Sequence, residues 1–265
     1  MGEPQVAWQA SLFSAARVGF DDAFSDLTRT QLDDDVWVDH CPGWLRGPDE
    51  LFAQLLREGQ WRQRTLRLFD QDVLEPRLTA GWTARAVTDW AAASLEARLR
   101  AQRSGGAGVE PGDAEADPEA DAEADAEPDH QEDHGEEAGT EPGDAPEQLP
   151  GPLGEIAAAL SRRYGVGFDS VWVNLYRDGR DSVAWHRDRN GRVLRNPLVV
   201  TISLGARRRF VMRPRSTSAV RFSLSPGHGD LVVMGGACQH TWEHCVPKTA
   251  KAVGARMSVT IRHSR

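Results

Sequence analysis

Two residues of the chain, His186 and Asp188, are spaced so that they could bind one metal ion together. Side chains at positions i and i+2 of an extended segment point to the same face, so the imidazole and the carboxylate could reach a common ion. His244 could supply a third ligand, with His240 as its rival. Two histidines and one carboxylate on one face of an ion form the facial triad that holds non-haem Fe(II). A surface histidine beside a turn aspartate is the alternative, because His-x-Asp is a common spacing.

The segment Arg256–Arg262 has a polar face that could bind a dicarboxylate. By period two, Arg256, Ser258, Thr260 and Arg262 share one side of a strand, and the apolar residues between them point to the other side. Two inward-facing arginines are costly unless they meet anions. A guanidinium group binds a carboxylate in bidentate fashion, and a dicarboxylate has two such groups. A solvated edge strand is the alternative.

The elements that would position these residues are mainly strands. Short runs rich in Val, Ile, Phe and Thr, separated by Gly, Pro and Asp, occur at 170–176, 198–204, 209–212, 220–224, 230–234 and 256–262. This pattern predicts a double-sheet jelly roll. Upstream, 36–40 alternates like a strand, and helices are expected at 49–58, 90–103 and 153–164. The expected fold is α+β and mainly β, a double-stranded β-helix core with flanking N-terminal helices. The apolar stripe of the helix at 49–58 consists of Leu51, Phe52, Leu55 and Leu56.

An acidic segment at 104–150 divides the chain. It contains 17 Asp and Glu and no Lys or Arg, and apart from alanine it has almost nothing apolar, so we expect a disordered insertion. The predicted parts are 1–103, an N-terminal part with helices, and 151–265, the jelly-roll core; together they would form one domain. The insertion could compete with nucleic acid for a basic face, or it could be a neutral solubilising linker.

The charge outside the insertion favours a polyanionic partner. The whole chain carries −9, but the 31 basic residues lie outside 104–150 with 40 − 17 = 23 acidic ones, which leaves 31 − 23 = +8. Cys41, Cys238 and Cys245 lack CxxC spacing and are expected to be buried thiols in a reducing cytoplasm. The N-terminal residues do not look like a secretory signal, and no apolar run is long enough to predict a membrane-spanning helix.

Four ordered blocks resemble the AlkB family of dioxygenases. They read NLYRDGRDSVAWHRD, PLVVTISLGARRRFVMR, GHGDLVVMGGACQHTWEHCVP and RMSVTIR, and together they cover most of 168–265. Weaker likeness extends upstream to WVDHCPGWL and to EPRLTAGW at 75–82, which looks like the family's nucleotide-recognition region. Four blocks in the right order and spacing are much more specific than any one of them.

We expect a cytoplasmic, monomeric enzyme, and the resemblance implies that it uses Fe(II), 2-oxoglutarate and O2. Its Fe(II) ligands and catalytic residues would be His186, Asp188 and His244, since the HCVP context of His244 matches the family better than that of His240. The residues around 2-oxoglutarate would be Asn174, Tyr176, Arg256, Ser258 and Arg262, with Arg256 at the distal carboxylate and Arg262 near the keto-acid end. His40, His228 and His263 would be ordinary histidines.

The resemblance further implies oxidative demethylation of N-alkylated bases, of the 1-methyladenine and 3-methylcytosine type, with release of formaldehyde, succinate and CO2. Such a base must be flipped out or single-stranded to reach the iron. Trp82 could stack on it, or be a core residue. Arg77 and the run Arg207, Arg208 and Arg209 could contact phosphates, or the run could be a solvated turn. Asn190 stands where many members of the family have an acidic residue that reads the base, which puts base preference in doubt.

Three alternatives remain open beside DNA repair. The same chemistry could act on RNA or tRNA bases, although we expect DNA rather than RNA as the partner. A 2-oxoglutarate hydroxylase of a small molecule or protein would have no use for the basic body. A non-catalytic binding module would be expected to have lost a ligand or an arginine.

Overall fold

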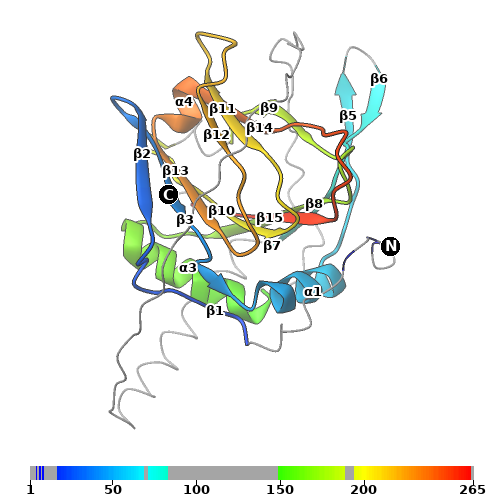
Figure 1. The fold of residues 1–265 in the computed structure, drawn as a ribbon, viewed down its shortest axis with the longest axis horizontal. Coiled ribbons are helices and arrows are strands. Elements are labelled where there is room, and N and C mark those ends of the chain that lie inside the picture. The colour runs from blue at the N-terminus through cyan, green and yellow to red at the C-terminus, as the bar shows by residue number, and fades with distance from the viewer. Residues whose placement is uncertain are drawn as a thin grey trace.

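Two antiparallel sheets face each other in a computed structural model of the chain (Figure 1). The structure describes Pro4, Val6, Trp8 and the ranges 17–68, 71–82, 149–188 and 194–263. Within these ranges the protein is mostly β with few helices, which is consistent with the predicted jelly roll. The predicted helix at 90–103 and most of the predicted insertion lie outside the described residues.

The larger sheet has seven strands in the described part of the chain, and every pairing is antiparallel. Its central strand is β10, and β15 lies between β10 and β8. In spatial order the strands are β2 (Thr28–Asp33), β3 (Val36–Cys41), β13 (Leu231–Gly236), β10 (Val199–Gly205), β15 (Arg256–Arg262), β8 (Ser170–Tyr176) and β7 (Leu78–Trp82).

The smaller sheet has four described strands and carries the two candidate histidine ligands. In spatial order these are β12 (Phe222–Leu224), β11 (Phe210–Pro214), β14 (Trp242–Val246) and β9 (Val183–His186). Two short pairs complete the β-structure: β1 (Gly19–Phe20) with β4 (Leu45–Arg46), and the hairpin β5 (Thr65–Leu68) with β6 (Gln71–Leu74).

Helices α1 (Pro48–Glu58) and α3 (Gly151–Tyr164) cover the outer face of the larger sheet (Figure 1). The predicted stripe of α1 is buried, with exposed fractions from 0% to 8% at Leu51, Phe52, Leu55 and Leu56. It packs in one apolar cluster with α3 and with the outward residues of β8, β10 and β15, such as Val173, Ile202 and Val259. A short helix, α4 (Cys238–Thr241), precedes β14. None of the described helices has the length and apolar character needed to cross a bilayer.

A second apolar cluster lies between the sheets and holds the site's framework together. It contains Val199 and Met234 from the larger sheet and Phe210, Met212 and Val246 from the smaller one. The predicted separation of faces on β15 is confirmed, because Met257, Val259 and Ile261 belong to the helix-side cluster. The polar residues of β15 therefore face the smaller sheet.

Within the described residues the strand and helix predictions are confirmed with small shifts at their ends, except that the strand predicted at 220–224 begins only at Phe222. The C-terminal end of the predicted insertion, at residues 149–150, lies within the described part of the chain. Leu149 is 5% exposed within the helix-side cluster, and Pro150 is the N-cap of α3. Burial of Leu149 ties this end of the segment to the folded body.

Candidate metal and co-substrate site

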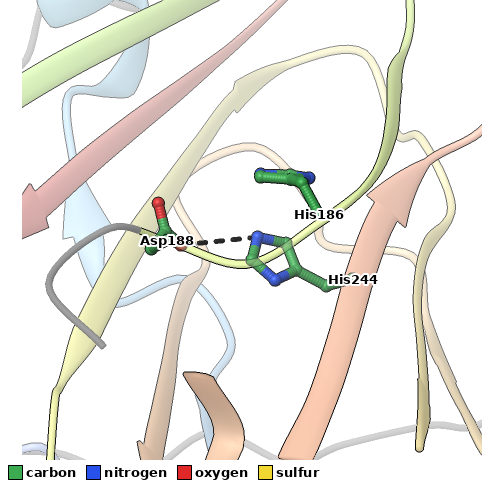
Figure 2. A group of neighbouring side chains, drawn as sticks. All are labelled: His186, Asp188 and His244. Atoms are coloured by element: carbon green, nitrogen blue, oxygen red, sulfur yellow. Dashed lines mark ion pairs between the residues drawn. The ribbon is translucent and has the colours of Figure 1, made fainter. Parts of the chain in front are cut away.

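The three predicted metal ligands converge between the two sheets (Figure 2). Each of His186, Asp188 and His244 offers a ligand atom, and these atoms all lie within 4.8 Å of one another. His186 ends β9, and it pairs directly with His244 on β14, so both side chains point to the same face. The two imidazole rings are 4.2 Å apart between centroids, and His244 Nε2 lies 3.5 Å from Asp188 Oδ2.

Hydrogen bonding and burial leave both imidazoles with a lone pair for a metal. His186 Nδ1 lies 2.9 Å from the carbonyl oxygen of Ala184, which can only accept, so Nδ1 carries the proton and Nε2 is available as a ligand. Burial, reinforced by the nearby positive charge of Arg262, lowers the pKa of His244 well below its ordinary value. His244 is therefore neutral at physiological pH, as a metal ligand must be.

Two neighbours hold Asp188 in place. Arg262 pairs through its Nη2 with Asp188 Oδ1, which leaves Oδ2 on the side of His244. Gln239 on α4 is 2% exposed, and its Oε1 accepts the backbone N–H of Asp188 at 2.8 Å. Outer groups of this kind orient metal ligands and tune their affinity. Asp188 is thus constrained at its backbone and at one carboxylate oxygen.

A row of polar side chains crosses the larger sheet beside these ligands. Asn174 on β8 is paired with Thr79 on β7 and with Ser258 on β15, and Ser258 is paired with Ser203 on β10. Tyr176 and Arg256 form the next pair of the same register. All five predicted co-substrate residues that lie on β8 and β15 therefore share the inner face of this sheet, with Arg262 at the end nearer Asp188.

Arg256 is the clearest sign of an anionic ligand. It is 1% exposed, its Nε donates to Ser203 Oγ at 3.3 Å, and its buried Nη1 has no hydrogen-bond partner. Among the described residues no carboxylate lies within ion-pair distance of it. A buried arginine without an anion is strongly disfavoured, so a ligand carboxylate would satisfy both the charge and the unused donor. The residues present thus fit a dicarboxylate beside a divalent metal.

Tyr176 lies among positive charges at the same end of the sheet. The guanidinium carbons of Arg256 and Arg208 are 5.2 Å and 5.8 Å from its ring centroid. Burial raises the pKa of Tyr176, against the opposing effect of Arg256, Arg77 and Arg208. The phenol therefore stays protonated and can donate a hydrogen bond to a ligand oxygen.

The remaining histidines of the described ranges have structural partners, as predicted for His40, His228 and His263. His40 bonds to Asp230, His228 to Asp49, and His263 Nε2 accepts the backbone N–H of Leu198. The rival ligand His240 has its Nε2 2.9 Å from the carbonyl oxygen of Arg195 and is not a member of the metal-binding group.

The three cysteines are buried free thiols, as predicted. Burial raises the pKa to about 11 at Cys41 and to about 12 at both Cys238 and Cys245. All three therefore remain protonated at neutral pH.

Two predicted substrate contacts are wrong in this structure. Trp82 is 2% exposed within the helix-side cluster, so it is a core residue with no ring face for a base. Arg77 is 6% exposed and bonds to Asn174 and Glu75, so it cannot contact a phosphate on the surface. Sequence reasoning missed this because an alternating strand leaves open which face is buried.

The other substrate predictions stay predictions. Arg207 and Arg209 are exposed, and their guanidinium groups bond to the Ser225 carbonyl oxygen and to Ser223 Oγ. Both therefore remain accessible to a phosphate. Asn190 lies outside the described residues.

The observed roles of three residues at the site were not predicted from the sequence. These residues are Arg77, Arg208 and Gln239. Arg208 is 3% exposed and donates to the carbonyl oxygens of Asp178, Asp181 and Pro247, which ties three loops together. Nothing distinguishes it in sequence from the exposed arginines on either side. For Gln239, the signal available in the sequence was its position five residues before the candidate ligand His244.

Comparisons with known proteins agree with this geometry. A family profile described as the 2OG-Fe(II) oxygenase superfamily matches residues 42–262. The chain is 27% identical over 237 residues to "Alpha-ketoglutarate-dependent dioxygenase alkB homolog 3" of Bos taurus, which covers 84% of this chain and 64% of that protein. It is 37% identical over 106 residues to the protein of the same name in Homo sapiens, or 37% of each chain.

A differently named relative is "DNA oxidative demethylase ALKBH2" of Arabidopsis thaliana. It is 34% identical over 134 residues, which is 42% of this chain and 43% of that protein. The chain thus spans less than two thirds of the length of each of these relatives.

Proposed function

Because this chain belongs to the 2OG-Fe(II) oxygenase superfamily and is a 2-oxoglutarate-dependent dioxygenase similar to AlkB homologues, we propose that it oxidatively demethylates N-alkylated bases of DNA. The family uses Fe(II), 2-oxoglutarate and O2. The observation that carries the proposal is the convergence of His186, Asp188 and His244 beside the partnerless Nη1 of Arg256. The names of the relatives and the +8 charge outside 104–150 support DNA as the substrate.

In the proposed reaction the chain's own residues provide binding and orientation. His186, Asp188 and His244 would hold Fe(II) on one side, which leaves the remaining positions for the co-substrate and O2. Arg256 would pair with the distal carboxylate of 2-oxoglutarate, and Asn174 and Tyr176 would donate hydrogen bonds to it. Arg262 would neutralise charge near the keto-acid end while it holds Asp188. When bound, the iron supplies the redox chemistry that couples conversion of 2-oxoglutarate to succinate and CO2 with oxidation of an N-methyl group, which leaves as formaldehyde.

The substrate is tested by an iron- and 2-oxoglutarate-dependent assay on methylated DNA and RNA oligonucleotides of the same sequence. We expect formaldehyde release from DNA carrying 1-methyladenine or 3-methylcytosine, and much less from RNA. Release from RNA alone would favour the RNA or tRNA alternative. Succinate production that is independent of any nucleic acid would favour a small-molecule or protein hydroxylase.

The ligand assignment is tested in the same assay with His186→Ala. We expect loss of turnover with an unchanged far-UV circular dichroism spectrum, because His186 lies on an edge strand and is only partly buried. His240→Ala is the matched control and should retain activity, since His240 lies outside the ligand group. Retained activity in His186→Ala would contradict the assignment.

A further inference from the structure

A buried ion pair, Glu75 with Arg77, lies directly behind Asn174. Arg77 immediately precedes β7, and its Nη2 lies 3.2 Å from Glu75 Oε1. Its Nε donates to Asn174 Oδ1 at 3.2 Å. Glu75 and Arg77 are 1% and 6% exposed. The arginine therefore links an internal carboxylate to a side chain of the proposed co-substrate site.

The chemistry of this contact decides which way the Asn174 amide points. A guanidinium group has five N–H donors and no acceptor, so only the oxygen of the amide can face it. The amide NH2 group must then point away from Arg77. Carboxylate and keto oxygens accept hydrogen bonds and donate none, so an NH2 group turned toward them is the productive orientation. The opposite amide orientation would present an oxygen to the anion and repel it.

We propose that Arg77 is a positioning residue that holds Asn174 with its NH2 group toward 2-oxoglutarate. The inference rests on the proposed function, since it takes Asn174 as a co-substrate ligand. It assigns to the segment Glu75–Arg77 a role in binding the co-substrate in place of the nucleic-acid role expected from sequence.

The segment that carries Arg77 is itself held from several sides. Gln63 Nε2 donates to the carbonyl oxygen of Glu75 at 2.8 Å, and the backbone N–H of Ser182 donates to the carbonyl oxygen of Pro76 at 2.8 Å. The backbone N–H of Glu75 donates to the carbonyl oxygen of Arg64 at 2.8 Å. With its backbone fixed and its guanidinium group bound by Glu75, Arg77 is preorganised, and little entropy is lost when it orients Asn174.

The alternative is that Arg77 only joins β7 to β8. A purely structural link would change thermal stability when it is removed, but it would leave the affinity for 2-oxoglutarate unchanged. It would also act independently of the Asn174 side chain. These two differences separate positioning from packing.

The test measures 2-oxoglutarate binding by isothermal titration calorimetry on the full chain loaded with Mn(II), which needs no turnover. Arg77→Gln alone would leave Glu75 buried without its partner, so the principal variant is Glu75→Gln with Arg77→Gln, which removes both charges. We expect its Kd for 2-oxoglutarate to rise about tenfold, which corresponds to ~1.4 kcal/mol. Affinity for Mn(II) alone should not change. Arg77→Lys, which keeps the charge but lacks the Nε donor, should give a smaller rise.

Coupling to Asn174 gives the decisive comparison. In an Asn174→Ala background the same Glu75→Gln/Arg77→Gln change should alter the Kd less than twofold, because the amide to be oriented is gone. Asp39→Asn with Arg29→Gln is the matched control, since it likewise removes both charges of an ion pair with a buried carboxylate, here at the other edge of the larger sheet, and it should bind 2-oxoglutarate like the unmodified chain.

Two results would overturn the inference in distinguishable ways. If the unmodified chain binds 2-oxoglutarate normally and the Glu75→Gln/Arg77→Gln variant does too, only the positioning role of Arg77 is lost. An equal rise in Kd with and without the Asn174 side chain has the same meaning. If the unmodified chain fails to bind 2-oxoglutarate with Mn(II) present, the proposed function fails and the inference falls with it.

Discussion

Gln239 illustrates how a residue that is not itself a metal ligand can affect a metal site. Its Oε1 accepts the backbone N–H of Asp188, and both residues are buried. If this bond is removed, the N–H of Asp188 remains buried without an acceptor, which costs ~1–3 kcal/mol unless the backbone at Asp188 moves. Any such movement shifts the Asp188 carboxylate relative to His186 and His244.

We therefore expect Gln239→Leu to weaken metal binding by about tenfold, the lower end of the effect typical of outer-shell groups. The measurement is a Mn(II) titration followed by electron paramagnetic resonance. Gln54→Leu on α1, where the amide bonds only to the exposed Glu58, is the control and should bind like the unmodified chain. An unchanged affinity in Gln239→Leu would show that Asp188 is placed without this bond.

Individual residues also show which features of the site the sequence could predict and which it could not. The spacing of His186 and Asp188 indicated two of the ligands, because strand geometry places i and i+2 on one face, and the HCVP context, which resembles the AlkB family, favoured His244 over His240. The burial of Arg77 and Trp82 was not predictable in the same way. Which face of β7 is covered depends on β8 and the helices packed on it, and these contacts are distant in the chain.

At the scale of the elements, the last residue of β10, Gly205, occupies a sterically demanding position. Gly205 has a φ of +85° and lies opposite Arg256 in the register of β10 and β15. A Cβ at this position would overlap the carbonyl oxygen of Ala255. Only glycine fits both conditions, because other residues rarely adopt positive φ.

Gly205→Ala should lower the free energy of unfolding by about 2 kcal/mol or more, as expected for strain combined with an overpacked backbone contact. Urea denaturation followed by tryptophan fluorescence measures it. Gly151→Ala, at the start of α3 with open space around the new methyl group, should be neutral or slightly stabilising. Equal stabilities of the two variants would contradict the placement of Gly205.

The junction of β3, β13 and the loops between them depends on one buried carboxylate, that of Asp230. Burial alone would raise its pKa, but hydrogen bonds from His40 and from the N–H groups of Gly43 and Gly227 outweigh burial, so the pKa of Asp230 is lowered. A carboxyl group with a lowered folded-state pKa stabilises the fold above its unfolded pKa of ~3.9. That stability is lost as the pH falls toward and through the folded-state pKa.

Thermal unfolding measured between pH 6 and pH 3 should therefore show a decline in Tm below about pH 4 to which Asp230 contributes. Asp230→Asn should have a lower Tm at pH 6 and a shallower decline, since an amide does not titrate. A decline of the same steepness in both proteins would show that other carboxylates account for the acid sensitivity.

For the molecule as a whole, the acidic segment has the largest effect on net charge. It contributes 17 negative charges, so its removal changes the chain from −9 to −9 + 17 = +8. If it competes with nucleic acid for the basic surface, the shortened chain should bind DNA more tightly and with a steeper dependence on salt. If it is a neutral linker, affinity should not change.

Fluorescence anisotropy with a single-stranded oligonucleotide at several salt concentrations distinguishes the two hypotheses. The deletion should cover residues 104–148 only, because Leu149 and Pro150 belong to the folded body. A chain with the 17 acidic residues changed to Asn and Gln keeps the length and isolates the effect of charge. The competition hypothesis predicts about tenfold tighter binding at low salt for both variants, and unchanged affinity in both would refute it.

The proposed activity depends most on the three ligands sharing one ion, and equilibrium dialysis against Fe(II) under anaerobic conditions measures this directly. The unmodified chain should bind one equivalent of iron, and affinity should fall by at least a hundredfold in His244→Ala and in His186→Ala. His240→Ala and His228→Ala, which alter histidines bonded elsewhere, should bind like the unmodified chain. Full binding of iron by His186→Ala and by His244→Ala would contradict the assignment of this site.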